Sequence, residues 1–239
     1  MSGRGGSILV VDVGTSGVRA AIVRPDATVD HEHRVPLLPD SPAPGMVEFD
    51  AARMADSVLT VARAALAEGG PVAGVGIADQ RASTIVWERA TGKPMAPGIG
   101  WQDLRTVGTC LVLQSEGIRL APNASATKVM AILDEVDPER ARAEQGDLCF
   151  GTVDSWVAWT LSGGAAAGAD ALHVTDATNA AVTALVDRAI VWDETLLQKL
   201  QIRPDYTTFE HRAQHSAPIR VITVKLRCPK GIAFLRSNR

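Results

Sequence analysis

The chain has 239 residues, of which 46% are hydrophobic, and this length suits a globular protein of one large or two modest domains. Charged residues make up 21% of the chain and the formal net charge is −3 without a long basic run, so the sequence argues against a nucleic-acid partner. No apolar run approaches the roughly 20 residues that cross a bilayer, and "MSGRGGS" is no signal peptide, so we expect a cytoplasmic protein without a membrane partner.

The first elements predict a mixed α/β sheet. Two β-branched runs, residues 8–13 and 18–23, are joined by "GTSG" and predict a hairpin, and "RPDA" turns the chain into a third strand that runs through Val35. Helical spacing of apolar residues predicts a helix over 50–68, capped by Asp50 and ended by glycines. The apolar "VAGVGIA" follows as a buried strand, and this order favours a mixed sheet with helices packed on its face.

The second half alternates short strands and helices. "STIVWERATGKPMAPGIGW" predicts two short strands around "ATGKP", and helices are expected over about 102–116 and 127–136. "LCFGTVDSWVAWTLSGG" predicts a strand, a turn and a short helix, whereas "GGAAAGADA" is expected to be a flexible loop. Asp154 and Asp176 are expected to cap helices, and the three cysteines to be reduced thiols in or near the core.

The turn of the opening hairpin is the first candidate site. Asp12 ends the first strand, and the turn itself consists of Gly14, Thr15, Ser16 and Gly17. Glycines take positive φ and let a backbone approach a ligand, so amide groups and the two hydroxyls can converge on a phosphate. Asp12 is placed to hold Mg²⁺ beside a nucleotide's phosphates. For these residues alone, a hairpin turn chosen only for its conformation is the more common explanation.

A second candidate site follows the strand "GVGIA". Gln80 and Arg81 emerge at its carboxyl end, where α/β folds place ligands, and the planar guanidinium suits a hydroxylated ligand. The start of an ordinary surface loop explains these residues equally well. Trp101 opens "WQDLRT", and its flat face suits stacking on a sugar or polyol, although core packing is the commoner use of tryptophan.

Taken in order, these segments resemble the FGGY family of carbohydrate kinases, most closely its glycerol kinase branch. The resemblance runs from about Ile8 to Pro204 and rests on these stretches: "VVDVGTSGVRAAIV", "PGMVEFDAARM", "GVGIADQRASTIVWERATGKP", "GWQDLRT", "SATKVMAILDEV", "FGTVDSWVAWTLSGG", "HVTDATNAA" and "WDETLLQKLQI". It implies an actin-like ATPase fold, related to ribonuclease H, and transfer of the γ-phosphoryl group of MgATP to a polyol or sugar hydroxyl.

The resemblance also assigns roles to the candidate residues. Asp12 resembles the residue near Mg²⁺, Thr15 and Ser16 resemble a phosphate-contacting turn, and Arg81 and Trp101 match residues that bind the acceptor's hydroxyls and carbon chain. Two positions depart from the glycerol kinase pattern, because Ala82 replaces a glutamate and Asn123 a tyrosine. Another polyol or a sugar is therefore an expected acceptor alongside glycerol.

The end of the sequence departs further from the family pattern. Family kinases continue into a "GDQ" segment with the general base and into a nucleotide-binding domain, neither of which occurs here, while residues 205–239 become basic and lose the pattern. We therefore expect residues 1–204 to be an acceptor-binding domain that is inactive alone and pairs with a missing C-terminal half or a second copy. The alternatives are a non-catalytic polyol-binding protein or a truncated remnant, and "PIRVITVKLRCP" can also be a strand that caps the domain.

Overall fold

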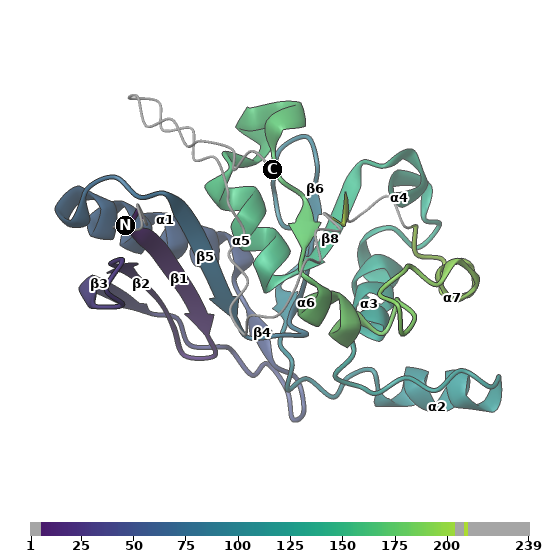
Figure 1. Cartoon of the computed structure of the whole chain (residues 1–239). Helices are drawn as coiled ribbons and strands as arrows, with labels where there is room; N and C mark the ends of the chain where they lie inside the picture. Colours follow the sequence, from purple (N-terminus) through teal and green to yellow (C-terminus); the bar gives the residue numbers. More distant parts are fainter. Residues whose placement is uncertain (1–5, 204–207, 210–239) are drawn as a thin grey trace.

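The computed structural model describes residues 6–203 and 208–209 (Figure 1). Along the chain its elements are β1 (Ile8–Gly14), β2 (Gly17–Val23), β3 (Val29–Pro36), β4 (Glu48–Phe49), α1 (Ala51–Gly69), β5 (Gly74–Asp79), β6 (Thr84–Glu88), β7 (Gly98–Ile99), α2 (Val107–Ser115), α3 (Ser125–Val136), α4 (Ala141–Gln145), β8 (Leu148–Thr152), α5 (Val153–Leu161), the 3₁₀ helix η1 (Gly164–Asp170), β9 (Val174–Thr175), α6 (Ala177–Thr183), α7 (Glu194–Lys199) and β10 (Thr208–Phe209).

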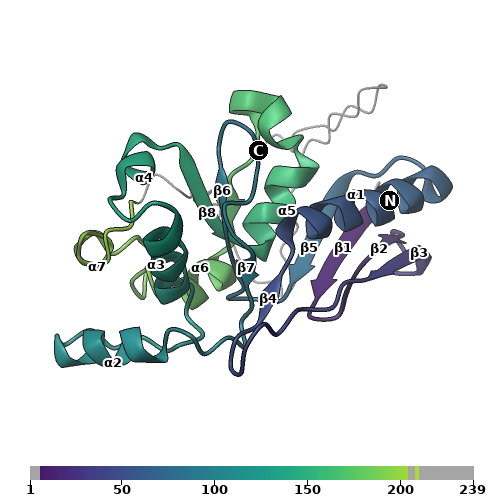
Figure 2. The same ribbon diagram turned by 180° about the vertical axis from the view of Figure 1, so that it is seen from behind.

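The opening strands form the predicted mixed sheet, with the strand order β3-β2-β1-β5. β1 pairs antiparallel with β2 and parallel with β5, so the carboxyl ends of β1 and β5 lie at the same edge. α1 crosses one face of this sheet, behind it in Figure 1 and in front of it in Figure 2. The parallel neighbour β5 therefore brings its following residues to the edge where the hairpin turn lies.

Helix α1 forms where the sequence predicts it. The carboxylate of Asp50 accepts a hydrogen bond from the backbone of Arg53, and Gly70, with φ of 78°, ends the helix by donating its N–H to Leu66. The helix buries one face, with Met54 and Val58 fully enclosed against the sheet. Burial of an apolar stripe of this kind supplies most of the stability of a helix in a protein.

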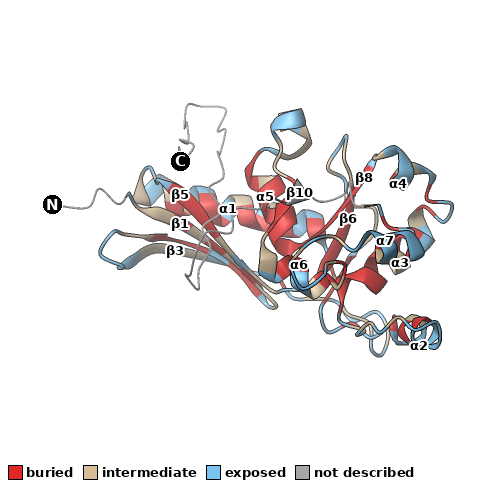
Figure 3. Cartoon of the chain, turned by 45° about the vertical axis from the view of Figure 1, so that its right-hand side comes forward, coloured by how far each residue is buried: buried red, intermediate tan, exposed pale blue. Residues whose placement is uncertain are grey.

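A second four-stranded sheet, ordered β4-β7-β6-β8, lies beside the first (Figure 1). Figure 3 shows buried residues along β1, β5, α5, β6 and β8, and they belong to two core clusters, one that includes α1 and one that includes α3. The indole rings of Trp87 and Trp156 pack with their centroids 5.1 Å apart, and Trp159 and His173 surround the same side chain. These rings join strand β6 to helix α5.

Three predicted elements differ from the structure. The helix expected from Gln102 begins only at Val107, because the Asp103 carboxylate accepts the backbone N–H of Arg105 and holds the preceding residues in turns. Strand β8 runs straight into α5 at Val153, without the expected turn. The small residues expected to form a flexible loop instead make a 3₁₀ helix that begins after Gly163, whose φ is 109°.

The thiols of Cys110 and Cys149 are free and buried, as predicted, while Cys228 lies outside the described residues. Within residues 6–203 and 208–209, no helix combines the length and the apolar character needed to span a bilayer.

Candidate active site

The turn between β1 and β2 presents polar groups at the edge of the first sheet. Thr15 and Ser16 form its tip, and Asp12 lies directly opposite Arg19 in the hairpin, with 2.7 Å between Oδ2 and Nε. The Asp12 side chain remains 28% exposed. Arg19 is the one exposed position in an otherwise buried stretch of β2, and this break in the apolar pattern is the sequence signal that would have identified it.

The two glycines of the turn do not adopt the positive φ that the sequence led us to expect, because neither is among the residues with left-handed backbone. A Cβ on Gly17 would lie 2.9 Å from the carbonyl oxygen of Val35, whereas one on Gly14 would meet only the Gly17 carbonyl at 3.6 Å. Gly17 is therefore required by close packing against β3. Close packing does not require glycine at position 14, because the added Cβ would make only this ordinary contact.

The end of β5 lies beside this turn. Asp79 pairs with Val13, and the backbone N–H of Gln80 donates to the Val13 carbonyl over 2.9 Å. Gln80 is half-buried and Arg81 is exposed, so the guanidinium is available to a ligand. The chain thus carries Arg81 to the edge formed by the hairpin, as the parallel pairing requires.

Trp101 links both segments. Its indole Nε1 donates to Thr15 Oγ1 over 3.3 Å, and its backbone N–H donates to Ser83 Oγ over 3.1 Å. At 41% exposure it is not a core tryptophan, unlike Trp87, which is fully buried. Together these contacts bring the candidate residues to one edge of the fold: Asp12, Gly14, Thr15, Ser16, Gly17, Gln80, Arg81 and Trp101.

Asp103 anchors the segment that carries Trp101. Although it is 1% exposed, its carboxylate accepts the backbone N–H of Val47 at 2.6 Å and binds the Arg105 guanidinium at 2.8 Å. Arg105 also pairs with Glu48 at 2.8 Å. This network fixes the proline-rich loop against the tryptophan segment, and sequence reasoning did not identify it.

A buried acidic cluster lies next to the end of β5. Asp79 Oδ1 accepts the side-chain N–H of Asn179 over 3.0 Å, while Asp79 Oδ2 and Asn179 Oδ1 have no hydrogen-bond partner among the described residues. Burial, and secondarily the charge of Asp154, raises the pKa of Asp79 to about 7. A proton on Asp79 would supply the donor that these buried oxygens lack.

The two aspartates expected to cap helices behave differently. Asp176 caps α6 by accepting the backbone N–H groups of Thr178 and Asn179. Asp154 does not cap a helix: it lies inside the first turn of α5, is 1% exposed, and accepts from Thr175 Oγ1 at 2.8 Å. Its burial raises its pKa to about 6. The sequence prediction failed because β8 enters α5 without a turn, which shifts the cap to Thr152.

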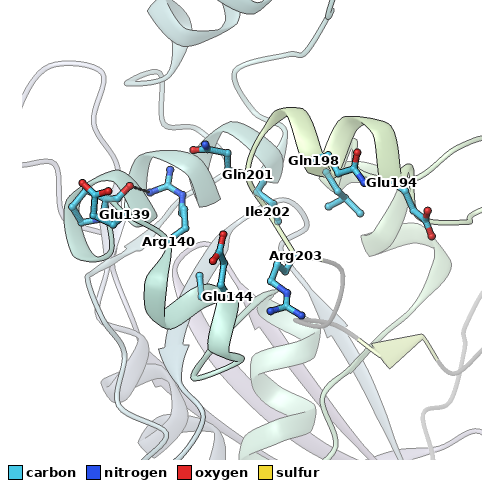
Figure 4. A pocket seen from close by; sticks show the side chains of 11 residues that line it. Glu139, Arg140, Glu144, Glu194, Gln198, Gln201, Ile202 and Arg203 are labelled. Atoms are coloured by element: carbon cyan, nitrogen blue, oxygen red, sulfur yellow. Dashed lines mark hydrogen bonds between the residues drawn. The ribbon is translucent and has the colours of Figure 1, made fainter.

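None of the candidate residues lines the cavity of about 430 Å³ between α4 and α7 (Figure 4). Acidic and basic side chains alternate around it, and its Arg140 donates to the carbonyls of Asp137 and Pro138 and pairs with Asp134. Its guanidinium therefore serves the connection between α3 and α4. A second hollow, between α1, α5 and η1, is mainly apolar and also excludes the candidate residues.

A magnesium ion fits the hairpin edge only with help from a ligand. Among the described residues, no group of three or more histidine, cysteine or acidic side chains is arranged to hold a metal. The partly exposed Asp12 carboxylate offers one oxygen site, and Mg²⁺ is commonly held by one or two carboxylates together with water and substrate phosphates. The donor set therefore suits Mg²⁺ that arrives with a nucleotide.

The sequence of the chain matches a known protein family and several curated proteins. Residues 7–217 match the N-terminal domain of the FGGY family of carbohydrate kinases. A glycerol kinase of Aromatoleum aromaticum is 42% identical over 212 residues, which cover 82% of this chain and 42% of that protein. A glycerol kinase of Afipia carboxidovorans is 40% identical over 210 residues, covering 82% and 41%. The chain thus spans about two fifths of the length of these curated relatives.

Solved structures share the fold. The glycerol kinase of Plasmodium falciparum, determined with ADP, superposes with a TM-score of 0.70 at 23% identity, over 82% of this chain and 40% of that one. A gluconate kinase from Lactobacillus acidophilus gives 0.71 at 18% identity, over 90% and 44%. The fold is therefore the actin-like ATPase fold, with a mixed sheet flanked by helices, as predicted. The family match continues to residue 217, so the domain boundary at 204 stays a prediction.

Proposed function

The chain belongs to the FGGY family of carbohydrate kinases, and from this premise we propose that it forms the acceptor-binding side of a site for ATP-dependent phosphoryl transfer to a polyol or sugar hydroxyl. The observation that supports the proposal most directly is the contact of Trp101 with Thr15. It joins the segment suited to a carbon chain to the turn suited to a phosphate. Phosphoryl transfer requires these two partners to be held in line, close to each other.

On the acceptor side, Arg81 donates hydrogen bonds to hydroxyl groups, and Gln80 adds an amide that both donates and accepts. The exposed face of Trp101 covers the carbon chain. On the phosphate side, Thr15 and Ser16 contribute hydroxyl and amide donors. These roles follow from the position of each group at the shared edge and from its chemistry.

Charge on the phosphate side is balanced by two groups. Arg19 is 57% exposed in its side chain and stands beside Asp12, so it is placed to approach an anionic ligand. Asp12 would hold Mg²⁺ directly or through water, and the ion would neutralise developing charge on the phosphate oxygens. We assign no general base to the described residues and expect the chain by itself to transfer little or no phosphate.

Two measurements on the purified chain test the proposal. Calorimetric titration with a panel of three- to six-carbon polyols and sugars is expected to show saturable binding of at least one compound. Arg81→Ala should weaken that binding by roughly ten- to a hundredfold, the usual effect of losing a hydrogen bond to a charged group. Arg53→Ala, at an exposed arginine on α1, is the matched control and should bind like the wild type.

An assay of γ-phosphate transfer from MgATP to the same panel completes the test. Binding without transfer agrees with the proposal and also describes a non-catalytic polyol-binding protein, whereas transfer would show that the chain supplies a complete site. Binding that is unaffected by Arg81→Ala would contradict the assignment of the acceptor side.

A further inference from the structure

The most deeply buried cation of the described residues is not among the candidate site residues. Lys128, in α3, has 0% of its surface exposed. Its Nζ donates to the backbone carbonyls of Ala82 at 3.0 Å and Asn123 at 3.1 Å. Among the described residues, no carboxylate lies within ion-pair distance of this ammonium, although the charge of Asp103 acts on it from farther away.

Such a lysine is costly for the fold. Burial disfavours its charged form, and lowers its pKa to about 8 against the opposing effect of Asp103. An apolar side chain of similar length would fill the same space without that desolvation cost. The presence of a buried ammonium here, with both of its contacts on backbone carbonyls, therefore points to a requirement for its hydrogen-bond donors.

The Ala82 carbonyl shows where those donors are needed. Ala82 follows Arg81 directly, is 5% exposed and has φ of 67°, a left-handed conformation that residues with a side chain rarely adopt. Its carbonyl oxygen accepts from Thr84 Oγ1 at 3.1 Å and Ser125 Oγ at 3.4 Å in addition to Lys128. Three donors thus converge on one peptide group and hold it in a conformation that is unfavourable by itself.

The same turn is tied down at two other points. Gln80 is hydrogen-bonded to β1 through Val13, and Ser83 accepts the backbone N–H of Trp101. Lys128 adds the link to the second half of the molecule, because α3 belongs to the core of the second sheet. Its other contact fixes Asn123, an exposed residue in the loop that precedes α3.

We propose that Lys128 is a positioning residue that holds the turn of residues 80–83 and thereby directs Arg81 toward the acceptor. That Lys128 holds the turn is inferred from its own hydrogen bonds and does not depend on the proposed function. Only the consequence for the acceptor rests on the proposed function. Lys128 touches no reacting atom and acts through the backbone that carries Arg81.

Hydrogen exchange of the full chain, measured without any acceptor, tests the hold directly. Lys128→Met keeps the length of the side chain and removes its donors, so exchange in peptides covering 79–84 and 99–103 should accelerate about tenfold or more. Lys128→Arg retains a charged donor and should restore part of the protection. Thr127→Val is the matched control: it removes the buried hydrogen bond to Thr106 from the neighbouring position of the same helix and should leave the peptide covering 79–84 unchanged.

If Lys128→Met does not fold, Ser125→Ala removes another donor to the same carbonyl and should accelerate exchange in the same peptides to a smaller extent. Unchanged protection of residues 79–84 in the folded Lys128→Met variant, or equal acceleration in Thr127→Val, would overturn the proposal. Acceptor titrations then separate the two ideas. Failure of every compound to bind the wild type would contradict the proposed function without altering the exchange result. If the wild type does bind an acceptor, Lys128→Met should lower the affinity for it about tenfold.

Discussion

The indole N–H of Trp101 donates to the hydroxyl of Thr15 across 86 positions of sequence, with 3.3 Å between nitrogen and oxygen. Neither residue depends on this bond for burial, since Trp101 is 41% exposed and Thr15 lies at the tip of a hairpin. The bond instead sets the distance between the hairpin turn and the segment "WQDLRT". It is a direct contact between two segments that the sequence singled out separately.

Replacement of Thr15 by Val is expected to release Trp101 without unfolding the protein. Water can satisfy the exposed indole N–H, so the free energy of unfolding should change by no more than about 0.5 kcal/mol. The exposed ring should gain freedom, which increases quenching of its fluorescence by acrylamide. A loss of stability of several kcal/mol would show that the contact is part of the core instead.

The two glycines of the turn should respond differently to alanine. Gly17→Ala places a Cβ 2.9 Å from the Val35 carbonyl oxygen in a backbone that cannot easily move, and is expected to cost about 1–3 kcal/mol of stability. Gly14→Ala meets only an ordinary contact at 3.6 Å and should be tolerated. Chemical denaturation of both variants measures the difference, and equal losses would contradict the close packing of β2 on β3.

Substitution of Asp103 should be among the most damaging changes near the site. Asp103→Ala leaves the N–H of Val47 without its acceptor and the Arg105 guanidinium without its buried carboxylate partner. The free energy of unfolding is expected to fall by about 3 kcal/mol. Thermal unfolding measures the loss. Glu88→Ala is the control, because the side chains of Glu88 and its partner Arg142 are 28% and 36% exposed and their ion pair should contribute about 1 kcal/mol or less.

The acidic cluster predicts a pH-dependent stability. The pKa of Asp79 rises from an ordinary 3.8 to about 7 on folding, so the folded state binds more protons between these values and the free energy of unfolding falls as pH rises through them. Burial lowers the pKa of His173 from 6.5 to about 4. This histidine therefore makes the free energy of unfolding rise with pH between those two values, opposite to the effect of Asp79. The wild-type curve alone is therefore not diagnostic.

Asp79→Asn isolates the effect of the acid. The variant should become increasingly stable relative to the wild type between about pH 4 and pH 7, and the difference should level off above that range. Denaturant titrations of both proteins at several pH values give this difference directly. A constant difference across the range would show that Asp79 is ionised throughout.

The sequence predicted the elements whose determinants are local. The β-branched runs of β1 and β2, the cap of α1 at Asp50 and the apolar strand before Gln80 each follow from residues within one element. The candidate residues lie at one edge because parallel strands β1 and β5 end together, a pairing that the sequence analysis did not specify.

The features that escaped prediction depend on contacts between distant segments. Asp103 accepts the backbone N–H of Val47, which lies 56 positions earlier, and Lys128 donates to Ala82 across 46 positions. Asp154 likewise accepts a hydrogen bond from Thr175, 21 positions away, so its buried position does not follow from its local sequence. In each case a polar side chain that looks ordinary in sequence gains its role from the groups that the fold places around it.

We propose that Arg81 and Trp101 form one acceptor-binding edge, and a fluorescence titration tests this proposal most directly. The wild-type chain is titrated with the panel of three- to six-carbon polyols and sugars while tryptophan emission is recorded, beside Trp101→Phe and Arg81→Ala. We predict a saturable change in emission with at least one compound, which disappears in Trp101→Phe and requires roughly ten- to a hundredfold more ligand in Arg81→Ala. A change that persists in Trp101→Phe, or the absence of any saturable response in the wild type, would contradict the account.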